Sequence, residues 1–306
     1  MKRLVKVVRS VKAFGRTLGG ASIAEANKQP VRIGLALGGG FARGIAHVGV
    51  LKVLEEANIP VDFIAGTSVG ALVGAAYCSG VSTAELEEIA TRVRFKHIAR
   101  WTLSRYGFAT NQRMIGFLNS ILKVKTFEDL RIPMAVTATD FSNGQGVVFR
   151  SGPLVDPVRA SCAYPGMFLP VRIGGRWLVD GMLAHSVPVA PLRAMGATHV
   201  LAVHLKTTWN VSDGPRHLFD VIGQCFAIAQ EMNCDLWKQA ADLVVEPAVQ
   251  GYKYDAFEHS AALVQAGAVA ARAALPEIRK WVEIASQPVS LKEARLVPQT
   301  APLPAD

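Results

Sequence analysis

One serine between two glycines, directly after an apolar run, has the clearest chemical meaning in this chain of 306 residues. Gly66, Ser68 and Gly70 form the pattern G-x-S-x-G within IAGTSVG. In a nucleophile elbow, this pattern occupies a sharp strand-to-helix turn that presents the serine hydroxyl above a sheet. The same serine could instead cap the following helix, because serine is a favoured N-cap residue. These five residues alone leave both interpretations open.

A glycine turn lies one strand-helix unit upstream, in LALGGGFARG at residues 35–44. Its glycines at 38–40 let the backbone approach a ligand closely and turn N–H groups outward, beside the positive end of the following helix. Such a turn is an anion cradle, and it can donate to an oxyanion that forms at Ser68. A dinucleotide fingerprint fits less well. Arg43 stands in place of its last glycine, and Asp62, the candidate acid, begins the next strand instead of ending it.

Asp180, in WLVDGML, follows a predicted strand and precedes Gly181, so a tight turn carries its carboxylate at a sheet edge. Taken alone, an Asp-Gly turn is common and carries little information. A Ser-Asp-His triad would also need a histidine in a loop before the final helix. His47 lies on an apolar helix face, where we expect a packing histidine with its hydrogen bonds satisfied. None of the downstream candidates stands out in such a loop: His199, His204, His217 and His259.

The elements that must position these groups alternate between strand and helix. We expect strands at 31–40 and 60–68, each followed by a helix, at 41–58 and 69–80. This order predicts a parallel sheet covered by helices on both faces. Further strands are expected at 132–140, 147–152, 198–205 and 241–249, and residues 176–183 are expected to form a short strand and a turn. Further helices are expected at 83–93, with Ser82 or Thr83 as the cap, at 153–168, where the helix should close near Pro165, and at 217–240 and 256–283.

The net charge of +9 is concentrated in two segments. Residues 1–30 contain seven Lys and Arg against one Glu, and residues 92–125 contain eight Lys and Arg with no acid. Such segments predict contact with something anionic. Both also carry large apolar side chains and neither has a nucleic-acid recognition motif, so we expect an anionic membrane surface and no nucleic acid. A solvated basic tail is the alternative for residues 1–30.

Composition predicts one domain. Half of the chain is apolar, which suffices for a sizeable core, and residues 31–283 show no internal repeat or linker. A basic leader at 1–30 precedes this domain, and a flexible tail with four prolines follows at 284–306. Glycines and polar residues interrupt the longest apolar stretches, and Lys or Arg interrupts those of the leader. We therefore expect no transmembrane helix or cleaved signal, and a cytoplasmic protein in peripheral contact with the inner membrane face. The four cysteines lack metal-site spacing, so we expect reduced thiols and neither metal nor cofactor.

Four stretches resemble the patatin-like phospholipases, and more narrowly their bacterial members: 35–56, 64–80, 159–171 and 180–189. The resemblance extends weakly to about residue 283. It implies an α/β fold, a three-layer sandwich around a mainly parallel central sheet. It also implies an acyl hydrolase with a Ser-Asp dyad and no catalytic histidine, acting on a lipid or ester. Ser68 is then the nucleophile, Asp180 the base, and Gly39, Gly40 and Phe41 form the oxyanion hole. The motif-supporting residues are Gly38, Arg43, Gly44, Gly66, Gly70 and Gly181.

Two positions depart from the family pattern. Phe41 stands where the family usually has glycine, and Met182 follows Gly181 where the family has glycine or alanine. Neither change removes a catalytic group, although the Phe41 side chain could narrow the acyl entrance. A non-catalytic or weakly catalytic regulatory or binding member of the fold is therefore the alternative. An aspartate of ordinary pKa is a weak base for serine, so the dyad would depend on desolvation of Asp180 and on fixed geometry.

Overall fold

The computed structural model describes residues 30–206, 214–215 and 218–286, and a compact unit begins at Val31. Except for Pro30, the expected basic leader lies outside the described residues, as does the expected tail beyond Ser286. No helix in the described part of the chain is both long enough and apolar enough to cross a membrane.

The described residues build an eight-stranded sheet in the order β10-β9-β1-β2-β5-β8-β7, with β6 also paired to β5. The first five strands of this order run parallel, whereas β6 and β8 are antiparallel to β5, and β7 is antiparallel to β8. The parallel strands are β1 (Ile33–Leu37), β2 (Phe63–Thr67), β5 (Met134–Asp140), β9 (His199–Val203) and β10 (Leu243–Val245). The others are β6 (Gly146–Phe149), β7 (Val171–Ile173) and β8 (Arg176–Asp180).

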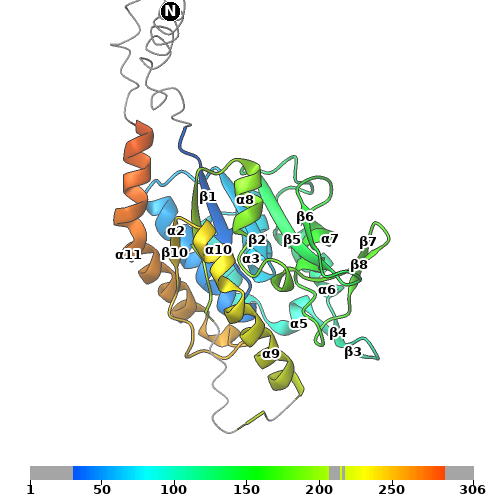
Figure 1. Cartoon of the computed structure of the whole chain (residues 1–306). Coiled ribbons are helices and arrows are strands. Elements are labelled where there is room, and N and C mark those ends of the chain that lie inside the picture. The colour runs from blue at the N-terminus through cyan, green and yellow to red at the C-terminus, as the bar shows by residue number, and fades with distance from the viewer. Residues whose placement is uncertain (1–29, 207–213, 216–217, 287–306) are drawn as a thin grey trace, which may run out of the picture. The chain divides into compact units, whose positions relative to one another are not determined.

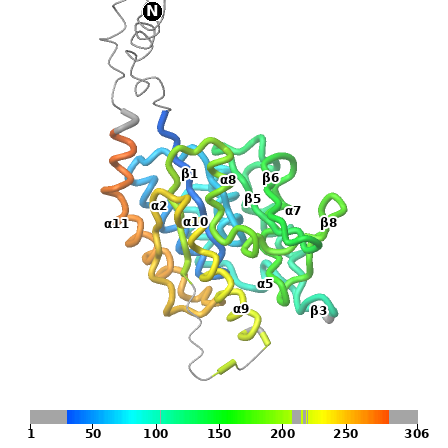
Figure 2. Tube along the Cα trace, viewed as in Figure 1, coloured from blue at the N-terminus to red at the C-terminus, as the bar shows by residue number. Residues whose placement is uncertain are grey.

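Helices cover both faces of this sheet, which confirms the predicted α/β fold (Figures 1 and 2). One face packs against helices that include α2 (Ala46–Glu56), α3 (Val69–Cys78), α4 (Thr83–Arg92), α7 (Val155–Ser161) and α11 (Ser260–Ser286). The other face packs against α8 (Val189–Met195) and α10 (Cys234–Ala240) through a smaller apolar core. Strands buried on both sides read as nearly continuous apolar runs, and this is why the sequence revealed them.

The helix predicted within 153–168, with its end near Pro165, is shorter than predicted, because α7 ends at Ser161. The residue before a proline is disfavoured in the helical region, so Tyr164 cannot extend a helix up to Pro165. The predicted helix at 217–240 is instead two helices, α9 (Leu218–Met232) and α10. Asn233 separates them, and its side-chain amide donates to the Ala229 carbonyl oxygen at 2.7 Å, a bond that competes with the helical pattern.

Four elements within the acid-free segment were not predicted: α5 (Phe95–Ile98), β3 (Arg100–Ser104), β4 (Gly107–Thr110) and α6 (Arg113–Ile121). Strands β3 and β4 form a separate antiparallel hairpin outside the main sheet. The cap predicted for α4 is confirmed, because Ser82 and Glu85 form a reciprocal capping box. At the other end of the unit, α11 continues to Ser286, past the expected domain end at 283.

The register of the sheet determines which strand ends lie next to each other. Thr67, the last residue of β2, pairs with Thr137, and Asp180, the last residue of β8, pairs with Ala138. Thr137 and Ala138 are consecutive residues of β5. Strand β2 lies parallel to β5 on one side of it, and β8 lies antiparallel on the other side. The residue after β2 and the last residue of β8 therefore arrive at the same place beside β5, although they are 112 positions apart in the chain.

Candidate active site

Ser68 occupies a strained turn between β2 and α3. Its φ of 55° and ψ of −123° lie in a region that residues other than glycine rarely adopt. Its side chain makes no capping bond to α3, so the cap interpretation is wrong. The hydroxyl instead donates to Asp180 Oδ2 at 2.7 Å. Both elbow glycines permit close approach: a Cβ at Gly66 would lie 2.5 Å from Ala71 Cα, and one at Gly70 would collide with the Leu37 carbonyl oxygen.

Ser161, at the end of α7, holds the backbone of this turn. Its fully buried Oγ accepts a hydrogen bond from the Ser68 N–H at 2.7 Å. The Ser68 backbone is thereby fixed by a side chain from a distant segment. Sequence reasoning missed this role, although Ser161 lies within one of the stretches that resemble the family. No local pattern marks a serine that bonds to a turn 93 residues away.

Asp180 is fully buried beneath Ser68. One carboxylate oxygen accepts from the Ser68 hydroxyl, and the other accepts from the Met182 N–H at 3.0 Å. Burial raises the pKa of Asp180 from 3.8 to about 7, and these two hydrogen bonds oppose that rise. The Gly181 that follows cannot carry a side chain, since a Cβ there would collide with the Thr137 carbonyl oxygen. A carboxylate with this pKa can accept a proton near neutral pH.

The glycine loop lies directly against Ser68, because a Cβ at Gly39 would be 3.5 Å from Ser68 Cβ. Two of its N–H groups are already used: Gly38 donates to the Val203 carbonyl oxygen at 3.1 Å, and Gly39 donates to that of Ser186 at 3.2 Å. Within the described residues, no hydrogen bond involves the next two N–H groups, those of Gly40 and Phe41.

His47 supports the loop from α2. Its Nε2 lies 2.9 Å from the Gly38 carbonyl oxygen. The side chain is fully buried, and burial lowers its pKa to about 4, so the ring is neutral and donates through Nε2–H. Within the described residues its Nδ1 has no partner, so the expected packing histidine is only half satisfied. Gly44 packs equally tightly, because a Cβ there would collide with the Val69 side chain.

Phe41 has a φ of 53°, in the left-handed region that favours glycine. This conformation gives a physical reason for the glycine usual at this position. Here the ring contacts three other aromatic rings, which stabilise the residue in this conformation. Their centroids lie 5.8–6.3 Å from its own, and they belong to Phe95, Tyr254 and Phe257.

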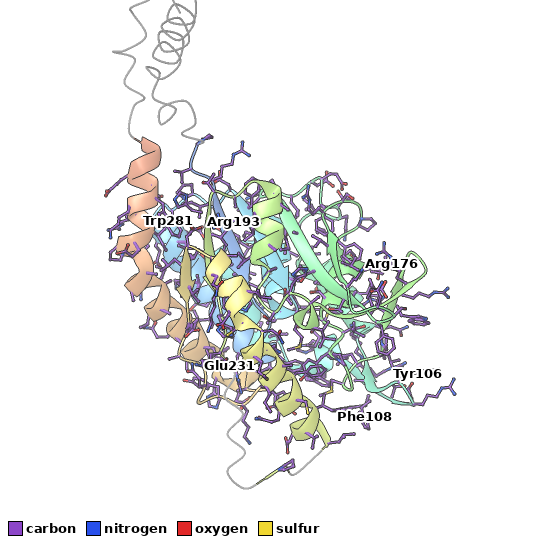
Figure 3. All side chains as sticks on the ribbon, in the orientation of Figure 1. Tyr106, Phe108, Arg176, Arg193, Glu231 and Trp281 are labelled. Atoms are coloured by element: carbon purple, nitrogen blue, oxygen red, sulfur yellow. The ribbon has the colours of Figure 1, made fainter. Side chains whose placement is uncertain are left out.

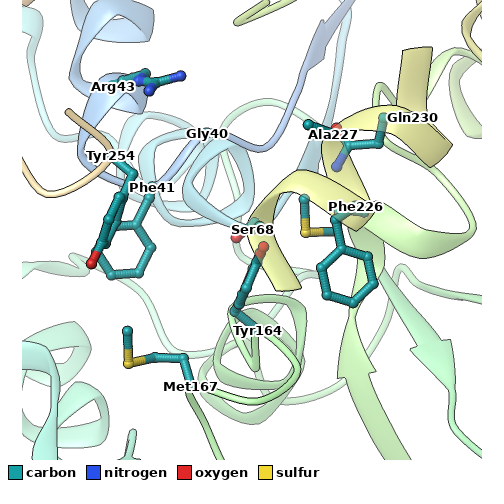
Figure 4. Close-up of a pocket in the computed structure, with 12 residues that line it drawn as sticks. Gly40, Phe41, Arg43, Ser68, Tyr164, Met167, Phe226, Ala227, Gln230 and Tyr254 are labelled. Carbon is teal, nitrogen blue, oxygen red and sulfur yellow. The ribbon is translucent and has the colours of Figure 1, made fainter. Parts of the chain in front are cut away.

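Two cavities meet at Ser68 and Phe41. The first is shown in Figure 4, and its lining includes Tyr164, Met167, Phe226, Gln230 and Tyr254. The second is almost entirely apolar and extends between α3, α4 and α6, where its lining includes Leu72, Ile89, Met114, Phe117 and Phe168. An ester carbonyl at Ser68 could therefore place one substituent in each cavity.

Arg43 lies at the wall of the first cavity and is largely buried. Its Nε donates to the Tyr252 carbonyl oxygen at 2.9 Å, and burial lowers its pKa. The side chain thus ties the segment after the glycine loop to the chain just before α11.

No described histidine is hydrogen-bonded to Ser68 or Asp180. His204 bonds to Glu246 and His199 to Thr198, while His217 lies outside the described residues. The described residues also contain no cluster of side chains that could hold a metal ion. All four cysteines are free. Burial and the nearby Asp180 raise the pKa of the Cys162 thiol, so this thiol stays protonated near neutral pH.

Known proteins resemble this chain in fold or in sequence. VipD from Legionella pneumophila matches the structure with a TM-score of 0.55 at 13% identity, over 81% of this chain and 67% of that chain, which supports the fold alone. An uncharacterized NTE family protein of Mycobacterium tuberculosis is 35% identical over 180 residues, covering 57% of this chain and 49% of that protein. Lysophospholipase NTE1 of Mycosarcoma maydis is 30% identical over 264 residues, covering 82% of this chain and 14% of that protein.

The chain thus spans about half the length of its mycobacterial relative and a small part of the fungal one. A family model described as patatin-like phospholipase matches residues 35–193, more than half of the chain. That match contains the glycine loop, the Ser68 elbow and Asp180. The chain therefore belongs to the patatin-like phospholipase family.

Proposed function

We propose that this chain is a serine acyl hydrolase that cleaves carboxylic esters of lipids through an acyl-enzyme on Ser68. The observation that carries the proposal is the 2.7 Å hydrogen bond from Ser68 Oγ to the buried Asp180, at a strained turn facing two cavities. A lipid substrate agrees with the family, and with the printed name of the fungal lysophospholipase.

In the acylation step, ionised Asp180 accepts the Ser68 proton as Oγ attacks the ester carbonyl carbon. The carbonyl π electrons move to oxygen, and we assign the N–H groups of Gly40 and Phe41 as donors to that oxyanion. Gly39 was expected to contribute as well, but its N–H already donates to the Ser186 carbonyl oxygen. Collapse of the intermediate breaks the C–O bond, and the leaving alcohol takes the proton from Asp180.

In the deacylation step, water takes the place of the alcohol. Asp180 accepts a proton from water as the water oxygen attacks the acyl carbon. The N–H groups of Gly40 and Phe41 again stabilise the oxyanion that forms. Collapse returns the proton to Ser68 Oγ and releases the fatty acid. With a pKa near 7, Asp180 is basic enough to take each proton and acidic enough to return it.

The two cavities divide the substrate. The apolar cavity beside α3 and α6 suits the acyl chain, because it offers hydrocarbon contacts along its length. The first cavity contains Gln230, Tyr164 and the Arg43 wall, and it suits the alcohol portion with its polar groups. Phe41 lines both cavities and separates the two portions of the substrate.

Hydrolysis of a lipid panel by the purified chain tests this function. Ser68→Ala and Asp180→Asn should each lower kcat by about 10³-fold or more, as expected when a nucleophile or its base is removed. Ser79→Ala and Asp140→Asn are matched controls, since both residues are buried and neither contacts the dyad. Unchanged hydrolysis in Ser68→Ala would overturn the proposal. Failure of a fluorophosphonate to label Ser68 in the folded chain would favour the non-catalytic alternative.

Peripheral contact with an anionic membrane is part of the same proposal. All eight Lys and Arg side chains of residues 92–125 are exposed, which supports a cationic surface in this segment. The other expected contact, residues 1–30, lies outside the described residues. Arg92 forms a salt bridge with Glu88, and Lys123 forms one with Glu85. Each of the other exposed cations contributes about 1 kcal/mol near an anionic leaflet, which supports reversible attachment.

A further inference from the structure

Helix α9 is apolar on two opposite faces. Its inner face lines the first of the two cavities at Ser68, through Gly223, Phe226, Ala227 and Gln230. Its outer face carries a stripe of exposed residues spaced three and four apart: Leu218, Val221, Cys225, Ile228 and Met232. At 3.6 residues per turn the two sets project to opposite sides of the helix. Met232 is 80% exposed and Leu218 58%, so the described chain leaves this stripe uncovered.

A second exposed apolar group lies on the β3–β4 hairpin. Trp101 is 63% exposed and Tyr106 62%, and Phe108 is also exposed. Two exposed cations, Arg100 and Arg105, accompany these rings, and the Arg105 guanidinium lies 4.8 Å from the Tyr106 ring centroid. Figure 3 shows Tyr106 and Phe108 pointing away from the sheet, at the same end of the molecule as α9.

Both groups are joined to the loop between α7 and β7, which lines the first cavity. From one side, the α9 residue Phe226 packs against Tyr164 with ring centroids 5.4 Å apart. From the other side, the hairpin residues Phe108 and Ala109 donate through their N–H groups to the Met167 carbonyl oxygen. Tyr164 and Met167 themselves line the cavity of Ser68. The exposed apolar residues therefore flank the cavity on two sides.

We propose that the outer stripe of α9 and the tip of the β3–β4 hairpin together form a docking surface for an anionic lipid bilayer. This inference rests on the proposed function and specifies how the substrate is reached. Aliphatic side chains, a Trp and a Tyr beside arginines are the composition of an interfacial binding surface. Arg100 and Arg105 complement anionic headgroups, and a lipid can pass from the bilayer through this first cavity to Ser68 without crossing water.

Vesicle co-sedimentation of the full chain tests this surface. Removal of one arginine, Arg100→Gln or Arg105→Gln, should weaken binding to equal parts phosphatidylglycerol and phosphatidylcholine about fivefold, the equivalent of about 1 kcal/mol. The double variants Ile228→Gln/Met232→Gln and Trp101→Ala/Tyr106→Ala should weaken it by about tenfold or more. Val269→Gln on α11 is the matched control, because this residue is 56% exposed and lies outside both groups.

Turnover separates surface binding from catalysis. The two double variants, in α9 and in the β3–β4 hairpin, should lose hydrolysis of long-chain esters in these vesicles. They should retain kcat/KM for a dissolved short-chain aryl ester. Wild-type vesicle binding by both double variants would overturn the inference. A change from oligomer to monomer in the α9 variant, with unchanged vesicle binding, would also overturn it and assign the stripe to contact between copies of the chain. Binding measured on Ser68→Ala needs no turnover, so the surface can be verified even if the proposed function fails.

Discussion

The free energy of unfolding of Asp180→Asn, relative to that of wild type, should increase as the pH rises from 5 to 8. Burial raises the pKa of Asp180 from 3.8 to about 7. Below pH 3.8 the carboxyl is protonated in both folded and unfolded chains, and its ionisation does not affect stability. Between pH 3.8 and about 7 the unfolded chain ionises first, so folding becomes progressively less favourable, by roughly 4 kcal/mol once pH exceeds 7. About 2–3 kcal/mol of that cost falls between pH 5 and pH 8.

The assay is chemical denaturation of wild type and Asp180→Asn at both pH values. The pH-independent cost of the substitution cancels when the two differences in unfolding free energy are compared. Asn cannot ionise, so its advantage over wild type should be about 2–3 kcal/mol larger at pH 8 than at pH 5. A change of less than about 0.5 kcal/mol would refute the argument that desolvation sets the Asp180 pKa.

Ser68→Ala provides a second, independent readout of the same pKa. The Ser68 hydroxyl lowers the pKa of Asp180 by donating to it, so the loss of this bond should raise that pKa further. The pH range over which stability falls should therefore extend above 7 in this variant. In the active chain, ester hydrolysis should increase as the pH rises through about 7, because only ionised Asp180 accepts the Ser68 proton.

Three further substitutions test the supports of the site. Ser161→Ala leaves the Ser68 N–H without its acceptor and should cost about 1–3 kcal/mol of stability. It should also lower kcat about tenfold at constant KM, whereas Ser161→Thr should restore kcat because it retains the hydroxyl. Phe41→Gly relieves about 1 kcal/mol of left-handed backbone strain but removes three ring contacts. Assayed on esters of graded chain length, it should accept bulkier acyl groups, and an unchanged profile would exclude Phe41 as a determinant of acyl specificity. Gly70→Ala forces a Cβ onto the Leu37 carbonyl oxygen and should destabilise the chain by about 3 kcal/mol or more in denaturant titrations. Gly116→Ala in α6, where a Cβ meets no atom within 4 Å, should be neutral or stabilising.

Local patterns identified the parts of this protein that depend on neighbours in the chain. The apolar runs before Gly38 and Ser68 predicted β1 and β2, and the glycines after them predicted tight turns into helices. These predictions succeeded because strand burial and turn geometry leave their marks within a few residues. Short elements such as α5 and the β3–β4 hairpin were missed, because their segment mixes cations and aromatics without a clear period.

The approach of Ser68 to Asp180 was a different kind of prediction. Local sequence motifs identified Ser68 and Asp180 separately, and the family resemblance paired them. Neither explained why the two side chains lie in contact. That reason is the register of β5, which pairs with the end of β2 at Thr137 and with the end of the antiparallel β8 at Ala138. Pairing between segments more than a hundred residues apart depends on the packing of the whole sheet.

Adjacent residues encode the fold class, the elbow serine and the glycine loop, so all three could be predicted from sequence patterns. The Ser161 support, the left-handed Phe41 and the two apolar faces of α9 became visible only in the folded chain. Each of these depends on contacts, or on missing contacts, between distant segments. A side chain's chemistry follows from its type, but its partners, its burial and therefore its pKa follow from what the fold packs around it.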